Sequence, residues 1–497
     1  MPHMREPPMA IPYTTAAELA RALAAGELSA REALEATLER IEARDGDLNS
    51  IVVRDFERAR LAARAADEAL ARGERRALLG VPMTVKEAFN VSGLPTTWGL
   101  AGARGTRASQ DAVAVRRLKA SGAVIIGKTN IPTNLGDWQC ANALYGRTRN
   151  PWSLERTPGG SSGGSAAALA AGLVPLELGS DLAGSLRVPA HCCGVFAHKP
   201  TLGLVPSRGH APPGAPELDV DPEPDLGVVG PMARSAGDLA IALDVLAGPD
   251  DPHAIACRLA LPPARHARLG EFKALVLDEH PLLPLSAEVR AAIRRFADRL
   301  ADTGCAVERS SPMLPDLALI DETFGLLLLA FIGANLPDSA YEARRQRTPS
   351  AAEPGTDSDP IRQRALLASH RDWLRARRTR TLLQHQWRAL FRAWDVVICP
   401  VLPVTAFEHD DREVDQRRIA IDGRPLPYAA LGVWAGPASL CGLPATAMPV
   451  GQDADGMPIG AQVIGPYLED RTTVAFAQLA EREFGGFRAP PGYGPAN

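Results

Sequence analysis

Residues 157–201 read TPGGSSGGSAAALAAGLVPLELGSDLAGSLRVPAHCCGVFAHKPT, and they carry the strongest signal in the chain. Two serines, Ser161 and Ser185, stand in glycine-flanked turns on either side of the apolar stretch 174–178. Glycine lets a backbone adopt conformations closed to other residues and approach a reacting group closely. Upstream, Lys86 follows an apolar run in GVPMTVKEAFNVSG (80–93). Together these features predict a nucleophile site that works without histidine.

The order of apolar and helical stretches around these motifs predicts the fold. We expect strands in the short apolar runs at 81–85, 124–126, 174–178 and 274–277. Helices are expected between them, at 112–120 and beyond 285. Such alternation indicates an α/β protein with a mixed, largely parallel central sheet that helices cover on both faces.

The N-terminal region predicts helices within 14–72. Thr15 with Glu18 and Ser29 with Glu32 are expected to form two capping boxes. In each, a hydroxyl and a carboxylate three residues later accept hydrogen bonds from free backbone amides at the start of a helix. A third helical stretch covers about 56–71. We expect these helices to cover the sheet rather than to react.

Composition excludes several classes of function. With 497 residues, 46% hydrophobic and 23% charged, and a net charge of −4, the chain has no general attraction for nucleic acid or anionic membranes. Its N-terminus lacks the apolar run of a signal peptide, which predicts a cytoplasmic protein. The seven cysteines show no CxxC spacing, so we expect reduced core thiols.

The order of the three motifs resembles the amidase signature family of enzymes. Further stretches that fit this family are GKTNIPTNLGDWQCANALYGRTRNPW (127–152), GVVGPMARSAGDLA (227–240), DVVICPVLPVTA (395–406), SLCGLPATAMPVG (439–451) and GMPIGAQVIGP (456–466). The resemblance covers nearly the whole chain and implies one catalytic domain over 7–491. Its core would comprise about 78–260 and 392–480, with a mainly helical, lid-like insertion at about 261–391.

The resemblance implies a Ser–cisSer–Lys triad. Ser185 would be the nucleophile, Lys86 the base, and Ser161, after a cis peptide bond, the relay between them. A buried lysine can serve as a base because burial lowers its pKa. Ser162, Asp181 and Arg187 would support this site, and no metal or cofactor is expected.

The turn before the nucleophile predicts an oxyanion hole. It would be formed by the backbone amides of Leu182, Ala183, Gly184 and Ser185. Ala183 replaces a glycine of the family pattern, so a positive φ at this position would carry a Cβ penalty.

The resemblance also implies a substrate pocket and a reaction. The pocket would include Leu135, Gly136, Asp137, Trp138 and Gln139. The substrate would be a small amide. Aryl amides, anilides, carbamates (urethanes) and esters are all candidates, because a serine nucleophile attacks their carbonyl carbon in the same geometry. Apolar Val188 beside the nucleophile offers no cation for a substrate carboxylate. Neither nucleic acid nor membrane is expected as a partner, and the protein would be a monomer or homodimer.

Three alternatives remain open. GGSSG also fits the G-x-S-x-G elbow of an α/β-hydrolase-type esterase. The chain could instead be the amidase subunit of a tRNA-dependent amidotransferase, although that subunit typically has glutamine where Val188 stands and a tyrosine within the segment that reads TLGLVPSRG in this chain. His191, Cys192, Cys193 and His198 could suggest a metal site, but their spacing favours core or loop positions.

Overall fold

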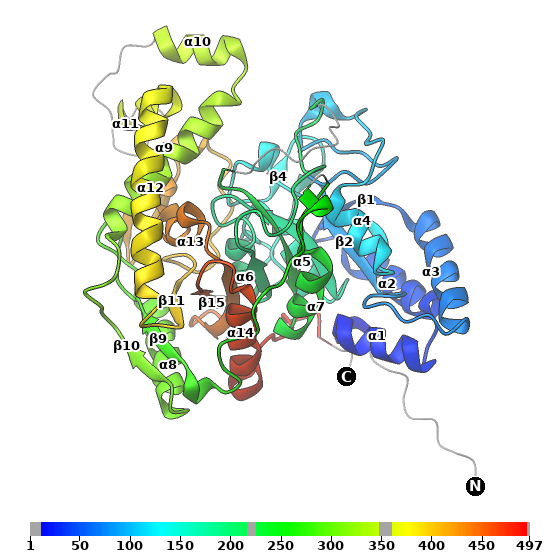
Figure 1. Cartoon of the computed structure of the whole chain (residues 1–497). Helices are drawn as coiled ribbons and strands as arrows, with labels where there is room; N and C mark the ends of the chain where they lie inside the picture. The colour runs from blue at the N-terminus through cyan, green and yellow to red at the C-terminus, as the bar shows by residue number, and fades with distance from the viewer. Residues whose placement is uncertain (1–10, 216–224, 252, 347–359, 495–497) are drawn as a thin grey trace.

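A single eleven-stranded sheet organises the computed structural model, which describes residues 11–215, 225–251, 253–346 and 360–494. The sheet runs through the centre of the molecule (Figure 1). In spatial order its strands are β1 (Ile51–Arg54), β3 (Val124–Thr129), β2 (Pro82–Lys86), β6 (Leu176–Asp181), β8 (Val228–Ala233), β7 (Phe196–Lys199), β14 (Ala445–Gln452), β15 (Pro458–Ile464), β11 (Val396–Pro400), β9 (Lys273–Val276) and β10 (Ala306–Glu308).

The predicted mixed α/β fold is confirmed. β3, β2 and β6 form a parallel group towards one end of the sheet, and β11, β9 and β10 form another at the opposite end. Between these groups the pairings are antiparallel. Every residue of β2, β3, β6, β8 and β15 is buried, as expected for strands covered on both faces.

The predicted N-terminal helices are present. They are α1 (Ala16–Ala25), α2 (Ala30–Arg44) and α3 (Phe56–Ala71). Both capping boxes form, and Gly26 ends α1 in the left-handed conformation with a φ of 73°. The C-terminal segment packs beside this region, because Arg40 donates to the carbonyl of Tyr493 at 2.6 Å.

Further helices enclose the strands that carry the serine motifs. α5 (Gly163–Ala170) packs on α6 (Arg187–Cys193), and α7 (Ala236–Leu246) packs on α14 (Asp470–Phe484). α4 (Val113–Ala120) contacts α7, and α8 (Ala287–Asp302) contacts β14, β11 and β15. α6 contains Cys192 and Cys193, and both are fully buried, which confirms the core position expected for them.

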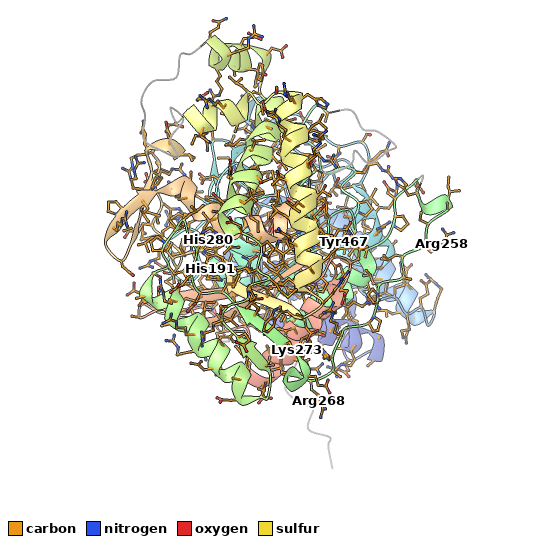
Figure 2. All side chains as sticks on the ribbon, turned by 60° about the vertical axis from the view of Figure 1, so that its left-hand side comes forward. His191, Arg258, Arg268, Lys273, His280 and Tyr467 are labelled. Carbon is orange, nitrogen blue, oxygen red and sulfur yellow. The ribbon has the colours of Figure 1, made fainter. Side chains whose placement is uncertain are left out.

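Helices α9 (Leu317–Ala334), α10 (Asp338–Gln346), α11 (Pro360–Leu366) and α12 (His370–Leu390) form a cover over one end of the sheet. Figure 2 shows α12 running alongside α9, in agreement with their contacts. The segment predicted as an insertion at about 261–391 therefore has two parts, because β9, α8 and β10 belong to the sheet layer. The single-domain assignment stays a prediction, and its residues 7–10 lie outside the described residues.

Among the described helices, α9 is the one long and apolar enough to span a membrane by length and composition, with a mean hydropathy of 1.9. Core helices pass the same test. α9 carries Asp321 and Glu322 in its first half and packs against α11, α12 and α13 (Gly436–Cys441), so we treat it as part of the cover.

A glycine sets how closely α5 approaches the sheet. A Cβ on Gly164 would lie 2.7 Å from the carbonyl oxygen of Asn130 and even closer to the Asn130 amide. Backbone atoms give way less easily than flexible side chains, so glycine is required here. This approach fixes the start of α5, and with it the Ser161–Ser162 turn, against the end of β3.

We expect Gly164→Ala to lower the free energy of unfolding by about 1–3 kcal/mol, the usual cost of overpacking. Gly325→Ala in α9 is the matched control, because nothing lies within 4 Å of a Cβ there. It should be neutral or stabilising by up to about 1 kcal/mol, as alanine favours helix. Urea unfolding of both variants checks this, and equal midpoints would contradict the steric argument.

Candidate active site

Lys86 ends β2 between two parallel neighbours and is fully buried. Its Nζ donates to Ser161 Oγ at 2.7 Å and to Ser180 Oγ at 2.9 Å. Burial lowers the pKa of Lys86 to about 7, against the opposing charge of Asp181. A large fraction of this amine is therefore neutral near neutral pH and able to accept a proton.

Burial alone does not single out Lys86. It also lowers the pKa of Lys128 to about 8 and that of Lys199 to about 7. Lys128 donates to Pro95 O and Thr96 Oγ1, and Lys199 donates to Pro200 O. Of these three buried lysines, Lys86 is the one whose amine contacts a serine of the glycine-rich turn.

The glycine-rich turn lies directly before α5. The Gly160–Ser161 peptide bond is cis, as the family resemblance implied. Ser161 is 1% exposed, and the Ser162 amide donates to the carbonyl of Ser185 at 3.2 Å. The Ser162 hydroxyl donates to Ser180 O at 3.4 Å. These bonds join the two serine motifs.

Ser185 stands at the end of the turn that follows β6, and its 9% exposure is the largest among the three residues predicted to form the triad. Asp181 shapes this turn by accepting from the amides of Gly184 at 2.8 Å and Leu186 at 3.1 Å. Arg187 pairs with Asp181 at 2.9 Å and also donates to Gln462 and Ser439. Although burial by itself would raise it, Arg187 holds the pKa of Asp181 at about 2.

The four predicted oxyanion donors are not equivalent. The amides of Leu182, Ala183 and Ser185 donate to none of the residues that the structure describes, whereas the Gly184 amide is taken by Asp181. The expected Cβ penalty at Ala183 does not arise, because the positive φ falls on Gly184, at 95°. Three amides thus remain available at this turn.

The five residues predicted to line the substrate pocket divide into two groups. Leu135 is half-buried and Gly136 is exposed, whereas the side chains of the other three are engaged within the protein. Asp137 pairs with Arg417, Trp138 donates to Ala183 O at 3.1 Å, and Gln139 exchanges two hydrogen bonds with the backbone of Asp410.

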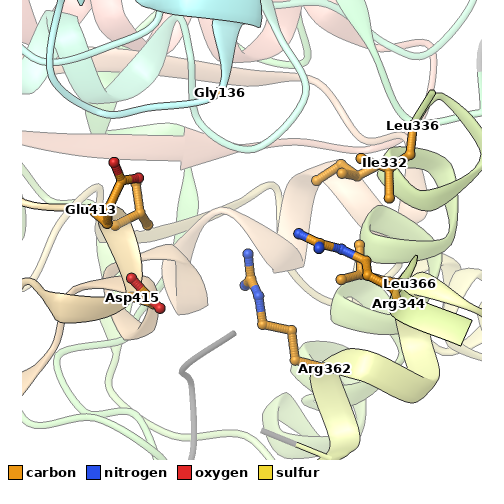
Figure 3. Close-up of a pocket in the computed structure, with 9 residues that line it drawn as sticks. Gly136, Ile332, Leu336, Arg344, Arg362, Leu366, Glu413 and Asp415 are labelled. Atoms are coloured by element: carbon orange, nitrogen blue, oxygen red, sulfur yellow. The ribbon is translucent and has the colours of Figure 1, made fainter. Parts of the chain in front are cut away.

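Gly136 borders a cavity of about 200 Å³ beneath the cover. Figure 3 shows Glu413 and Asp415 on one wall, with Arg344 and Arg362 on the opposite wall. The remaining lining residues are Ile332, Leu336, Leu366 and Val414. The cavity therefore combines apolar helix surface with charges of both signs.

The geometry bears on two of the alternatives. His191 contacts the backbone of Gly460 and Val404, while His198 contacts Thr446 and Asp470. In the described part of the chain no group of three or more His, Cys, Asp or Glu residues is arranged to hold a metal ion. The strand that leads into an α/β-hydrolase elbow has no counterpart here, because the strand preceding Gly159 along the described chain is β5 (Gly146–Arg147).

Sequence reasoning missed two residues near Lys86. Ser180 accepts a hydrogen bond from the amine, and its place directly before Asp181 in GSDLAGS was an available signal. The His210 ring packs at a tilt against the rings of Phe89 and Trp98, and its buried Nε2 has no hydrogen-bond partner among the described residues. Burial, assisted by the charge of Lys86, lowers the pKa of His210 to about 3. No motif marks it in the sequence.

Comparison with known proteins identifies the family to which this chain belongs. A model of the amidase family matches residues 32–474. A glutamyl-tRNA(Gln) amidotransferase subunit of Anaeromyxobacter sp. (strain K) is 36% identical over 95% of this chain and 97% of its own length. The putative amidase AmiB2 of Mycobacterium tuberculosis (strain H37Rv) is also 36% identical, with the same two coverages.

Two solved structures resemble this chain in both sequence and fold. A chain from a vestigial protein complex described as revealing the origins of an s-triazine catabolic enzyme has 33% identity and a TM-score of 0.80, with coverages of 96% for this chain and 100% for that one. A 6-aminohexanoate cyclic dimer hydrolase with bound substrate has 27% identity and a TM-score of 0.78, with coverages of 97% and 99%. The chain therefore belongs to the amidase signature family, whose enzymes act on carbon–nitrogen bonds.

Proposed function

We propose that this protein is a serine hydrolase that cleaves small linear amides through an acyl-enzyme intermediate. The observation that carries the proposal is the 2.7 Å contact between the buried Lys86 amine and Ser161 Oγ, with a lysine pKa of about 7. A serine hydroxyl needs an adjacent base to act as a nucleophile. Lys86 is that base, Ser161 the relay and Ser185 the nucleophile.

Acylation begins when Ser185 Oγ attacks the substrate carbonyl carbon. Its proton passes to Ser161 Oγ as the Ser161 proton passes to neutral Lys86. The oxyanion lies against the free amides of the turn 182–185. The amide C–N bond then breaks, and Lys86 returns the proton through Ser161 to the departing amine.

Deacylation repeats the path with water as the nucleophile. Water attacks the acyl carbon and passes a proton through Ser161 to Lys86. The ester bond to Ser185 then breaks, Lys86 returns the proton through Ser161 to Ser185 Oγ, and the acid is released. Hydrogen bonds of this kind often reach their working length only with substrate bound. We therefore assign the hydrogen bond between Ser185 Oγ and Ser161 Oγ to the complex with bound substrate.

The proposed substrates are small and lack a carboxylate near the scissile bond. Val188, the buried residue after Arg187, presents an apolar side chain close to Gly184. Aryl amides, anilides and carbamates or urethanes fit this environment, and activated esters would be cleaved as a side activity. We further propose a cytoplasmic monomer or homodimer that needs neither nucleic acid, membrane nor cofactor.

A second candidate is the amidase subunit of a tRNA-dependent amidotransferase. The 36% identity to such a subunit over nearly the full length favours it. Val188 and the tyrosine-free segment TLGLVPSRG count against it, because that subunit typically differs at both places. We therefore prefer the free-standing hydrolase.

Replacing the nucleophile tests the assignment directly. Ser185→Ala should abolish turnover while the protein stays folded, because the change removes one oxygen and no packing. A fluorophosphonate probe should label Ser185 in the unaltered protein, as found by peptide mass spectrometry. Ser310→Ala, in an exposed position, is the control and should keep full activity. Labelling of Ser161 or Ser162 would instead support the esterase elbow.

The base role of Lys86 predicts a pH profile. The active form is the neutral amine, so kcat/KM should fall as pH decreases through about 7, where the amine protonates. Lys86→Arg keeps the charge but cannot act as a base, and its activity should be near background. Lys273→Arg, at an exposed position on β9, should leave both rate and profile unchanged. An active Lys86→Arg variant would refute the base role.

A substrate panel separates the two candidate functions. The purified chain alone should turn over at least some p-nitroanilides, aryl carbamates or p-nitrophenyl esters. Size-exclusion chromatography should show a single polypeptide species. Turnover that requires tRNA, ATP and additional subunits would contradict the hydrolase and establish the amidotransferase.

A further inference from the structure

Asp137 lies in the loop expected to contact substrate, yet its carboxylate is fully engaged inside the protein. Arg417 Nη1 donates to Oδ2 at 2.6 Å, and Tyr428 Oη donates to Oδ1 at 2.7 Å. The Gln139 amide also donates to Oδ1, at 3.2 Å. With both oxygens occupied and the side chain largely buried, Asp137 is not free to bind substrate.

Its two main partners come from one distant segment, residues 405–434. This segment holds the hairpin of β12 (Arg418–Ile421) and β13 (Arg424–Pro427), followed by the 3-10 helix η7 (Tyr428–Trp434). Arg417 and Tyr428 flank the hairpin, and the Tyr428 amide donates to Arg417 O at 3.2 Å. The guanidinium also lies over the Tyr428 ring, 5.3 Å from its centroid. Asp137 thus holds both ends of the hairpin at once.

Trp138 connects this junction to the nucleophile turn. Its ring lies 5.6 Å from that of Tyr428, and its indole Nε1 donates to Ala183 O at 3.1 Å. On its other edge the ring packs on Gly432, where a Cβ would come within 2.9 Å of Trp138. Trp138 is therefore held between η7 and the turn whose amides are the proposed oxyanion donors.

The same loop also abuts the glycine-rich turn. A Cβ on Gly160 would lie 2.9 Å from Trp138 Cα and would clash with Asp137 O. Gly160 directly precedes Ser161. One short loop thus contacts the backbone next to the relay serine and the backbone next to the nucleophile.

We propose that Asp137 is a positioning residue that couples the segment 405–434 to the nucleophile turn through Trp138. Its catalytic consequence rests on the hydrolase function proposed above. Small displacements of reacting groups can cost about 10²-fold in rate, so a loosened Trp138 should lower kcat. KM should change little, because Asp137 does not touch the substrate.

A double-mutant cycle tests the coupling. Asp137→Asn keeps the shape but loses the ion pair with Arg417. Trp138→Phe keeps an aromatic ring but loses the bond to Ala183 O. Each should lower kcat about tenfold with KM within about twofold. The kcat of the double variant should be no more than about twofold below that of the less active single variant, because both substitutions act through one contact. Additive losses, a change in KM alone, or unchanged kcat would overturn the proposal.

Hydrogen–deuterium exchange provides a readout that is independent of activity. In Asp137→Asn, peptides covering 410–428 and 184–188 should both exchange faster than in the unaltered protein. Faster exchange in 410–428 alone would overturn the coupling, even if the hydrolase function failed the Ser185 labelling test. Tyr428→Phe, which loses one hydroxyl, should give the same pattern if Asp137→Asn does not fold.

The matched control is Arg412→Gln in the same segment. Arg412 pairs with Asp410 at the surface, and such exposed pairs contribute little. Its backbone carbonyl still accepts from Arg417 Nε, since the substitution alters only the side chain. Exchange and kcat should both match those of the unaltered protein. Equal effects from Arg412→Gln and Asp137→Asn would show a general response of the segment and overturn the specific role of Asp137.

Discussion

The burial of one amine is the constraint on which the site depends. Lys86 can act as a base near neutral pH only while water and negative charge are kept from it, since both would raise its pKa. The sheet supplies the first condition, because β3 and β6 flank β2 where Lys86 ends it. Gly164 helps to exclude water as well, because it lets α5 pack closely on the backbone of Asn130.

Negative charge near the amine is controlled in two ways. Asp181 remains ionised, but Arg187 pairs with it and partly offsets its pull on the proton of Lys86. Glu177, which accepts a hydrogen bond from Thr84 two residues before Lys86, is handled differently. Burial raises the pKa of Glu177 to about 8, so this carboxyl is mostly neutral at pH 7. The carboxyl groups along β6 are therefore either paired or uncharged.

Local chemistry explains which parts of this arrangement the sequence predicts. Thr15 with Glu18, the apolar run before Lys86 and the two glycine-serine turns each act within a few residues, and the structure places all of them as expected. The use of the Gly184 amide by Asp181 was missed, because the sequence does not show which way a turn amide points. Cys192 and Cys193 take the core position that was expected, but the sequence did not predict their helix, because a short apolar run fits a strand and a buried helix equally well.

Long-range contacts account for the rest. Asp137 was expected to line the substrate pocket because the family resemblance implied it. Its real partners, Arg417 and Tyr428, lie more than 250 residues away and carry no motif. The same holds for His210, whose place near Lys86 follows from the packing of Phe89 and Trp98. Such pairings are set by tertiary packing, which periodicity and turn chemistry do not encode.

The exclusion of water from Lys86 has a consequence for catalysis. Full hydration would return the pKa of Lys86 from about 7 towards the ordinary lysine value of 10.5. At pH 7 the neutral fraction would then fall from about one half to roughly 0.03%, a loss of about a thousandfold in base. A segment that keeps water from the site thus contributes to the base strength of a residue it need not touch. Substitutions in β2, β3, β6 or at the start of α5 are therefore limited by the need to keep Lys86 dry.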